Sequence, residues 1–192
     1  MSQIKMMDKI GCDVTRNRFI GGEEGNLKAY VTYRFSQFRN GELIHFQENH
    51  NTVTSEGKQH LLSSAIDNGT RKTAWYVALV SNDGPPPSPL ASHVYDTFFQ
   101  TTVTEFTDYS AATRVAYDGV VSADKITNIA NKASFTINAA TKDVYGGALV
   151  SNSTKSDHTS GDILMSWAAL PGGVLDVQVN DVLNIEIELA FA

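Results

Sequence analysis

The last ten residues of the chain carry its most regular alternation of apolar and polar side chains. Apolar residues recur at every second position over 183–191, and most positions between them are polar. Successive side chains of a β-strand point to opposite faces, so this period predicts an antiparallel strand with one buried and one wet face. Val177 and Val179 precede an Asn180-Asp181 turn, which predicts that the chain closes as a hairpin.

A second alternating stretch runs from Leu27 to Ser36, where the odd-numbered residues are apolar up to Phe35. It predicts a long two-faced strand. Asn40-Gly41 follows, and this pair accepts the positive φ angles of a type I′ turn. Residues 42–48 are therefore predicted to return as an antiparallel strand, with Ile44 and Phe46 on one face.

Residues 55–66 have the period of a helix. Thr54 is placed to cap the amino end, and Asp67-Asn68-Gly69 to end the helix. The predicted apolar stripe consists of Leu61, Leu62, Ala65 and Ile66. We expect this to be the only substantial helix, packed across one end of the domain.

The remaining pattern predicts short strands. Residues 74–80 are apolar on both faces, as expected of a central strand covered on both sides. A polar loop is predicted at 151–162. Further strands are predicted at 101–106, 112–117, 132–138, 144–150 and 163–170. The chain is thus predicted to be mainly β, an antiparallel β-sandwich or jelly-roll-like domain over 27–192 with one short helix.

Two segments are predicted to reach neighbouring molecules. Residues 1–26 read as an extended amino-terminal arm that ends in a Gly-rich break. The proline-rich segment 85–89 cannot join a sheet ladder and is predicted to be a stiff, exposed excursion. The candidate partner contacts are Arg16, Arg18, Phe19, Pro85, Pro86, Pro87 and Pro89.

Composition narrows the classes of function. The chain has 15 basic and 21 acidic residues and a net charge of −6, which argues against nucleic acid as a direct partner. No run of about 18 apolar residues is present, so no membrane span is predicted. The first residues do not resemble a signal peptide, and we expect synthesis in the cytoplasm. Cys12 is the only cysteine and has no intrachain disulfide partner.

Residue types that carry chemistry do not form a recognised pattern. His45 and His50 lie on opposite faces of an extended strand, which argues against a shared metal ion. Asp157, His158 and Ser160 lack the nucleophile-elbow pattern of a hydrolase triad. We therefore expect a protein that is not an enzyme, with no catalytic, cofactor-binding or metal-binding residues.

The two tryptophans leave one binding alternative open. An exposed indole stacks well on a sugar ring, so Trp75 and Trp167 can be read as a carbohydrate platform. Both lie inside apolar strand patterns, which favours packing in the core.

A series of strand and turn strings carries a resemblance to a known group of proteins. The series begins with Asn51-Thr52-Val53-Thr54 and continues in chain order through 57–62, 75–80, 133–137, 144–150, 164–167 and 180–185. In these strings the chain resembles small virion structural proteins of tailed bacteriophages, and the resemblance covers roughly residues 50–192.

The resemblance implies a non-enzymatic part of a phage particle. The first expectation is a capsid cement or decoration protein that binds the major capsid protein on the virion surface, as a homotrimer by analogy. The alternatives are a tail or fibre component and a receptor-binding module for glycans at the tail. A glycan-cleaving enzyme ranks last, because no paired carboxylate motif is present.

Overall fold

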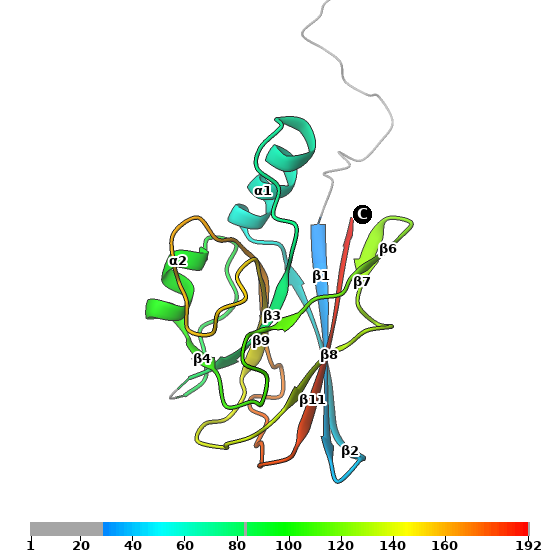
Figure 1. The fold of residues 1–192 in the computed structure, drawn as a ribbon, viewed down its shortest axis with the longest axis vertical. Coiled ribbons are helices and arrows are strands. Elements are labelled where there is room, and N and C mark those ends of the chain that lie inside the picture. Colours follow the sequence, from blue (N-terminus) through cyan, green and yellow to red (C-terminus); the bar gives the residue numbers. More distant parts are fainter. Residues whose placement is uncertain (1–28, 83, 192) are drawn as a thin grey trace, which may run out of the picture.

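The computed structural model describes residues 29–82 and 84–191, which form two antiparallel sheets. The first sheet has the order β2 (Glu42–Thr52), β1 (Ala29–Arg39), β11 (Val182–Phe191), β7 (Lys125–Thr127) and β6 (Val120–Ser122), with β8 (Ala133–Thr136) also paired to β11. The second sheet has the order β10 (Leu164–Ala169), β9 (Gly146–Val150), β3 (Tyr76–Ser81) and β4 (Thr104–Phe106), with β5 (Val115–Ala116) also paired to β3. The predicted mainly β, sandwich-like fold is confirmed (Figure 1).

The hairpin of β1 and β2 forms as the alternation predicts. Asn40 and Gly41 connect the two strands with φ angles of 53° and 83°, the left-handed region that an Asn-Gly pair accepts. Val31, Tyr33 and Phe35 of β1 are fully buried. A register shift between Gln37 and Phe38 marks a bulge near the tip of the hairpin.

Strand β11 lies in the middle of the first sheet. It pairs with β1 on one edge and with β8 and β7 on the other. The predicted alternation holds, since Leu183, Ile185 and Ile187 are fully buried and Leu189 nearly so. Burying these aliphatic side chains is a main contribution of the first sheet to stability.

The predicted closing hairpin before β11 is wrong. Residues 177–179 form no strand, and Leu175 instead makes an isolated bridge with Val144. Both edges of β11 are occupied by other strands. In addition, Asp181 Oδ2 accepts from the backbone N–H of Gln178 at 2.9 Å, which folds this segment into a turn.

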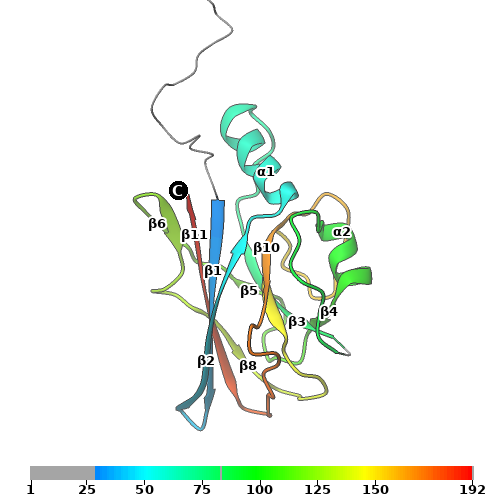
Figure 2. The ribbon, with the colours of Figure 1, turned by 180° about the vertical axis from the view of Figure 1, so that it is seen from behind.

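Strand β3 is a central strand covered on both faces, as its sequence predicts. Val77 and Leu79 point into the main core between the sheets. Ala78 and Val80 point the other way, into a second cluster that contains Trp167. That second cluster lies beneath a short helical region on the outer face of the second sheet (Figures 1 and 2).

This helical region was not predicted. It consists of α2 (Tyr95–Thr97) and a π-helical turn over Phe98–Thr102, which includes the first two residues of the strand predicted at 101–106. Tyr95 and Phe98 are both fully buried, and their spacing of three residues places them on one helical face. The β6–β7 hairpin was also not predicted, because its strands have only three residues each.

Helix α1 (Ser55–Ile66) stands at one end of the sandwich (Figure 2). Its predicted cap is confirmed, since the Oγ1 of Thr54 accepts from the N–H of Gly57 at 2.9 Å. Gly57 sits so close to β10 that an added Cβ would lie 2.7 Å from the Met165 carbonyl oxygen. Among the helices of the described ranges, none is long and apolar enough to cross a membrane.

The predicted apolar stripe of α1 is only partly buried. Leu61 packs against the main core, but Leu62 and Ile66 are exposed, the latter by 80%. The helix touches the sheets mainly through its first turns, near Gly57, so its far end extends beyond the sandwich.

Candidate functional site

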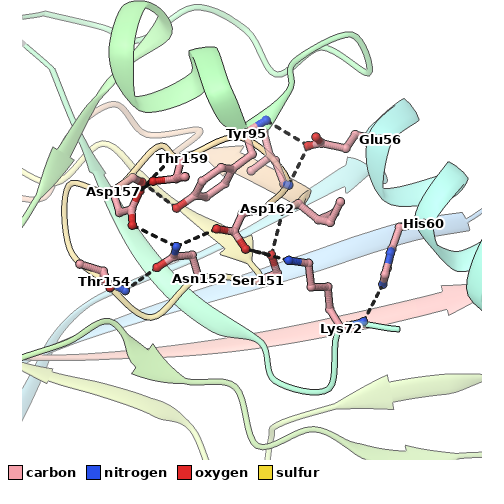
Figure 3. A network of polar contacts seen from close by, with 12 residues as sticks. Glu56, His60, Lys72, Tyr95, Ser151, Asn152, Thr154, Asp157, Thr159 and Asp162 are labelled. Carbon is pink, nitrogen blue, oxygen red and sulfur yellow. Dashed lines mark hydrogen bonds and ion pairs between the residues drawn. The ribbon is translucent and has the colours of Figure 1, made fainter. Parts of the chain in front are cut away.

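A polar network holds the loop 151–162 between β9 and β10 (Figure 3). Asp162 is its centre: its Oδ2 accepts from Asn152 Nδ2 at 2.7 Å, and its Oδ1 accepts from Lys72 Nζ and Ser151 Oγ, each at 3.0 Å. Burial raises the pKa of Asp162, but these three donors outweigh it and hold that pKa below its ordinary value. The carboxylate therefore serves as a fixed, charged anchor.

Asp157 anchors the middle of the same loop. The backbone N–H of Thr159 donates to Asp157 Oδ1 at 2.6 Å, and the Thr159 hydroxyl also donates to it. These two hydrogen bonds are the main reason why the pKa of Asp157 lies below its ordinary value. Within the described chain the other side-chain partner of this carboxylate is Asn152, so Asp157 is not positioned as a triad member with His158 and Ser160.

A buried ion pair lies beneath the loop. Arg114 donates from Nε and Nη2 to the two carboxylate oxygens of Glu105, each at 2.8 Å, and both side chains are almost completely buried. The remaining Nη1 donates to Tyr95 Oη at 2.7 Å, and Nη2 also donates to the Asp157 carbonyl at 3.0 Å. Burial alone would lower the pKa of Arg114, but Glu105 more than offsets it.

Glu56 joins α1 to this region. One of its carboxylate oxygens accepts from the N–H of Tyr95 at 3.0 Å and from the N–H of Leu164 at 2.8 Å. Burial raises the pKa of Glu56 above its ordinary value, although both hydrogen bonds act in the opposite direction. The network therefore connects α1, α2 and β10, and its polar side chains stabilise the fold.

The histidines behave as the strand pattern predicts. His45 contacts Gln47 on the inward face of β2, whereas the exposed His50 contacts Thr32 and Glu48. In the described ranges, no group of three or more His, Cys, Asp or Glu side chains is arranged to hold a metal ion.

A pocket of about 540 Å³ opens beside α1, between the two sheets. Leu149, Met165 and Leu189 of the core line its floor, and Trp75 and Tyr117 line its walls. The core interpretation of the tryptophans holds: Trp167 is buried, and Trp75 is partly buried and packs against the main core, although it also lines this pocket.

The outward face of the β2 hairpin is apolar. Leu43, Ile44 and Phe46 are 55%, 46% and 54% exposed. The hairpin tip lies at the opposite end of the molecule from α1 (Figure 1). We call these three side chains the hairpin patch. Large apolar side chains gathered on one exposed hairpin are typical of a surface that binds a partner.

The inward face of β2 is polar. Asn49 Nδ2 donates to the Ala169 carbonyl at 2.5 Å, Asn51 Nδ2 donates to the Trp167 carbonyl, and Gln47 Oε1 accepts from the N–H of Gly172 at 3.0 Å. Strand β10 is the edge of the second sheet, and these amides occupy part of its free hydrogen-bonding edge. The amides join the two sheets along this side.

The predicted partner contacts are separated in the chain. Arg16, Arg18 and Phe19, with the predicted arm 1–26, lie outside the described residues. Pro85 and Pro87 are exposed, and Pro86 and Pro89 are half-buried, in the connection between β3 and α2.

Comparisons with known proteins identify no relative. Neither the models of protein families, nor the curated proteins, nor the solved structures include a match to this chain.

Sequence reasoning missed both the hairpin patch and the pocket. Ile44 and Phe46 were expected to share a face, but the period alone does not say which face of an edge strand is outward. The pocket joins residues from α1, the segment 71–76, β5 and β6, which are far apart in sequence.

Proposed function

We propose that this protein is a structural component of a phage virion, a capsid cement or decoration protein that binds the major capsid protein on the outer surface of the shell. The observation that carries the proposal is the hairpin patch. Its three large apolar side chains stand on a hairpin whose first strand, β1, pairs along its length with the central strand β11, so the fold holds the hairpin in place although a bulge interrupts the β1–β2 register near its tip. The resemblance in the strand and turn strings supports the same class.

The size of the hairpin patch fits a repeated, multivalent contact. A stable protein interface buries about 800 Å² on each partner. Three side chains on one hairpin supply only part of that area, although Phe46 is the kind of aromatic anchor that dominates binding energies. As a homotrimer the protein presents three such patches, and linked contacts bind far more tightly than one. The proline segment 85–89 and the arm 1–26 are further candidate contacts.

In this role the protein stabilises the shell by mass action. A cement protein that binds the assembled lattice, and not dispersed subunits, shifts the equilibrium toward the lattice by an amount that grows with its free concentration. The chemistry required is surface contact, which agrees with polar networks whose carboxylates are held by the fold.

Binding to shells tests the proposal. Purified shells that lack the protein are mixed with the full chain, pelleted, and assayed for bound protein. We expect the wild type to pellet with shells and Phe46→Ser to bind at least tenfold more weakly, because it removes the aromatic anchor. Ile66→Ser is the matched control, since Ile66 is an exposed apolar residue on α1, at the other end.

Equal binding by Phe46→Ser and wild type would contradict the role of the hairpin patch. Failure of the wild type to bind any shell would contradict the cement function itself.

A receptor-binding module for glycans at the tail is the second candidate. The indole of Trp75, which is partly exposed and lines the pocket beside α1, favours it, because aromatic faces stack on sugars. A glycan array separates the two candidates: specific glycan binding that is lost in Trp75→Ala would favour the tail module over cement.

A further inference from the structure

The pocket beside α1 has the dimensions and lining of a small-molecule site. Its volume of about 540 Å³ lies within the range of about 300–1,000 Å³ that is typical of ligand pockets. Its walls come from α1, the segment 71–76, β5 and the β6–β7 hairpin, and its floor is the main core. The site is therefore built by the whole end of the sandwich.

The inner part of the pocket is apolar. The aliphatic side chains of Leu61, Ile126, Leu149 and Leu189 and the thioether of Met165 line it. Against these apolar side chains alone, the hydroxyl groups of a sugar would find no hydrogen-bond partners, so a glycan stacked on Trp75 would have to contact the polar lining residues such as Ser64 and Thr73. A hydrocarbon group would instead remove apolar surface from water on both sides.

The rim of the pocket carries an uncommitted positive charge. Arg71 is exposed there, and within the described residues no carboxylate lies within ion-pair distance of it. The neighbouring Lys72 is engaged by Asp162 at 3.0 Å. Asp118 lines the pocket from the segment after β5. An anionic group is therefore attracted to the side of the rim that Arg71 occupies.

His60 lies between these two parts. Its Nε2 accepts from the N–H of Lys72 at 3.4 Å, and its ring meets Trp75 edge to face with centroids 5.7 Å apart. Burial, helped by the charge of Lys72, lowers the pKa of His60. The ring is therefore neutral at pH 7 and extends the uncharged wall.

We propose that this pocket binds a small amphiphile with an apolar body and one anionic group, as in a medium-chain carboxylate. The hydrocarbon lies on the floor formed by Leu149, Met165 and Leu189, beside Trp75, and the anion pairs with Arg71. This site is at the opposite end of the molecule from the hairpin patch, so it is independent of the proposed capsid contact.

Calorimetric titration of the full chain with decanoate, below its micelle concentration, tests the proposal. We expect saturable binding with a stoichiometry near one per chain. Arg71→Gln should weaken decanoate binding about tenfold and leave decanol binding unchanged, because it removes only the charge. Lys142→Gln is the matched control, as Lys142 is an exposed cation in the loop before β9.

A second pair of variants tests the location. Ala74→Phe fills the pocket from its wall and should abolish decanoate binding, whereas Ala140→Phe places the same ring on an exposed loop elsewhere. The absence of saturable decanoate binding to the wild type would overturn the site. Unchanged binding in Ala74→Phe would overturn its location, and equal decanoate affinity in Arg71→Gln would overturn the anionic class. None of these outcomes affects binding to shells.

Discussion

Strands β2 and β11 flank the same strand, β1, yet they bury opposite kinds of side chain. Strand β11 follows the usual rule for a half-buried strand, with aliphatic residues such as Ile185 and Ile187 facing the core. Strand β2 reverses it: the amides of Asn49 and Asn51 face the second sheet, and Phe46 faces solvent.

The difference follows from what lies opposite each strand. Strand β11 faces the packed interior, where apolar contact is favourable. Strand β2 overlies the free edge of β10, where carbonyl groups require hydrogen-bond donors (Figure 2). An edge strand whose inward face is used for polar contacts can carry apolar residues outward. The contrast separates a strand that stabilises the fold from one that is available for binding.

The largest difference in stability between the two strands is expected from a matched pair of truncations. Ile187→Ala on β11 removes a fully buried side chain and should lower the free energy of unfolding by about 2–5 kcal/mol. Ile44→Ala on β2 removes a half-exposed one and should change it by no more than about 0.5 kcal/mol. Urea unfolding of both variants measures these values. Similar losses would contradict the contrast between the strands.

A charged contact at Asp181, the residue before β11, attaches the start of that strand to β1. Asp181 accepts from Arg39 Nε and Gln37 Nε2 at 2.9 and 2.8 Å, and its side chain is 1% exposed. Asp181→Asn should cost about 1.5–3 kcal/mol at pH 7, the range for hydrogen bonds to charged groups.

The same contact makes the stability of the fold decrease at acidic pH. Hydrogen bonds, above all those from Arg39, lower the pKa of Asp181 from its ordinary value of 3.8 in the folded state. The stabilisation is therefore present above pH 3.8 and is lost as the pH falls through the lower folded-state pKa. Acid unfolding of the wild type and Asp181→Asn measures it. Stability curves that stay parallel below that pH would contradict the assignment.

A smaller effect is expected at the inward face of β2. Asn51→Ala removes the donor to the Trp167 carbonyl and should destabilise the fold by about 1 kcal/mol. Glu48→Gln, on the exposed face of the same strand, is the control and should be nearly neutral, because its partner Arg34 is partly exposed. Thermal unfolding distinguishes the two. A neutral Asn51→Ala would mean that the amides do not stabilise the joint between the sheets.

The sequence allowed the local elements to be predicted where one physical signal dominates. Asn40-Gly41 defined the hairpin, Thr54 defined the start of α1, and the strict alternation over 183–191 defined β11. The elements that were missed depend on distant partners. Tyr95 and Phe98 form helical turns because they pack on β3 and β9, which the local sequence does not reveal.

The candidate site was less predictable than the fold. From the sequence alone, the amide side chains of β2 look like an ordinary solvent-facing polar face. Their role as donors to β10 is visible only in the folded structure. Arg71 and Trp75 can be recognised as parts of one site only when the fold brings α1 and the segment after β5 together around the pocket. The predicted contacts Pro85, Pro86, Pro87 and Pro89 stay a prediction.

The location of the protein in particles tests the central proposal most directly. A labelled copy is incorporated, and purified virions are imaged by electron microscopy at low resolution. The cement function predicts label density distributed over the whole shell. Density confined to one vertex would contradict it in favour of a tail role, and absence from the particle would contradict both structural functions.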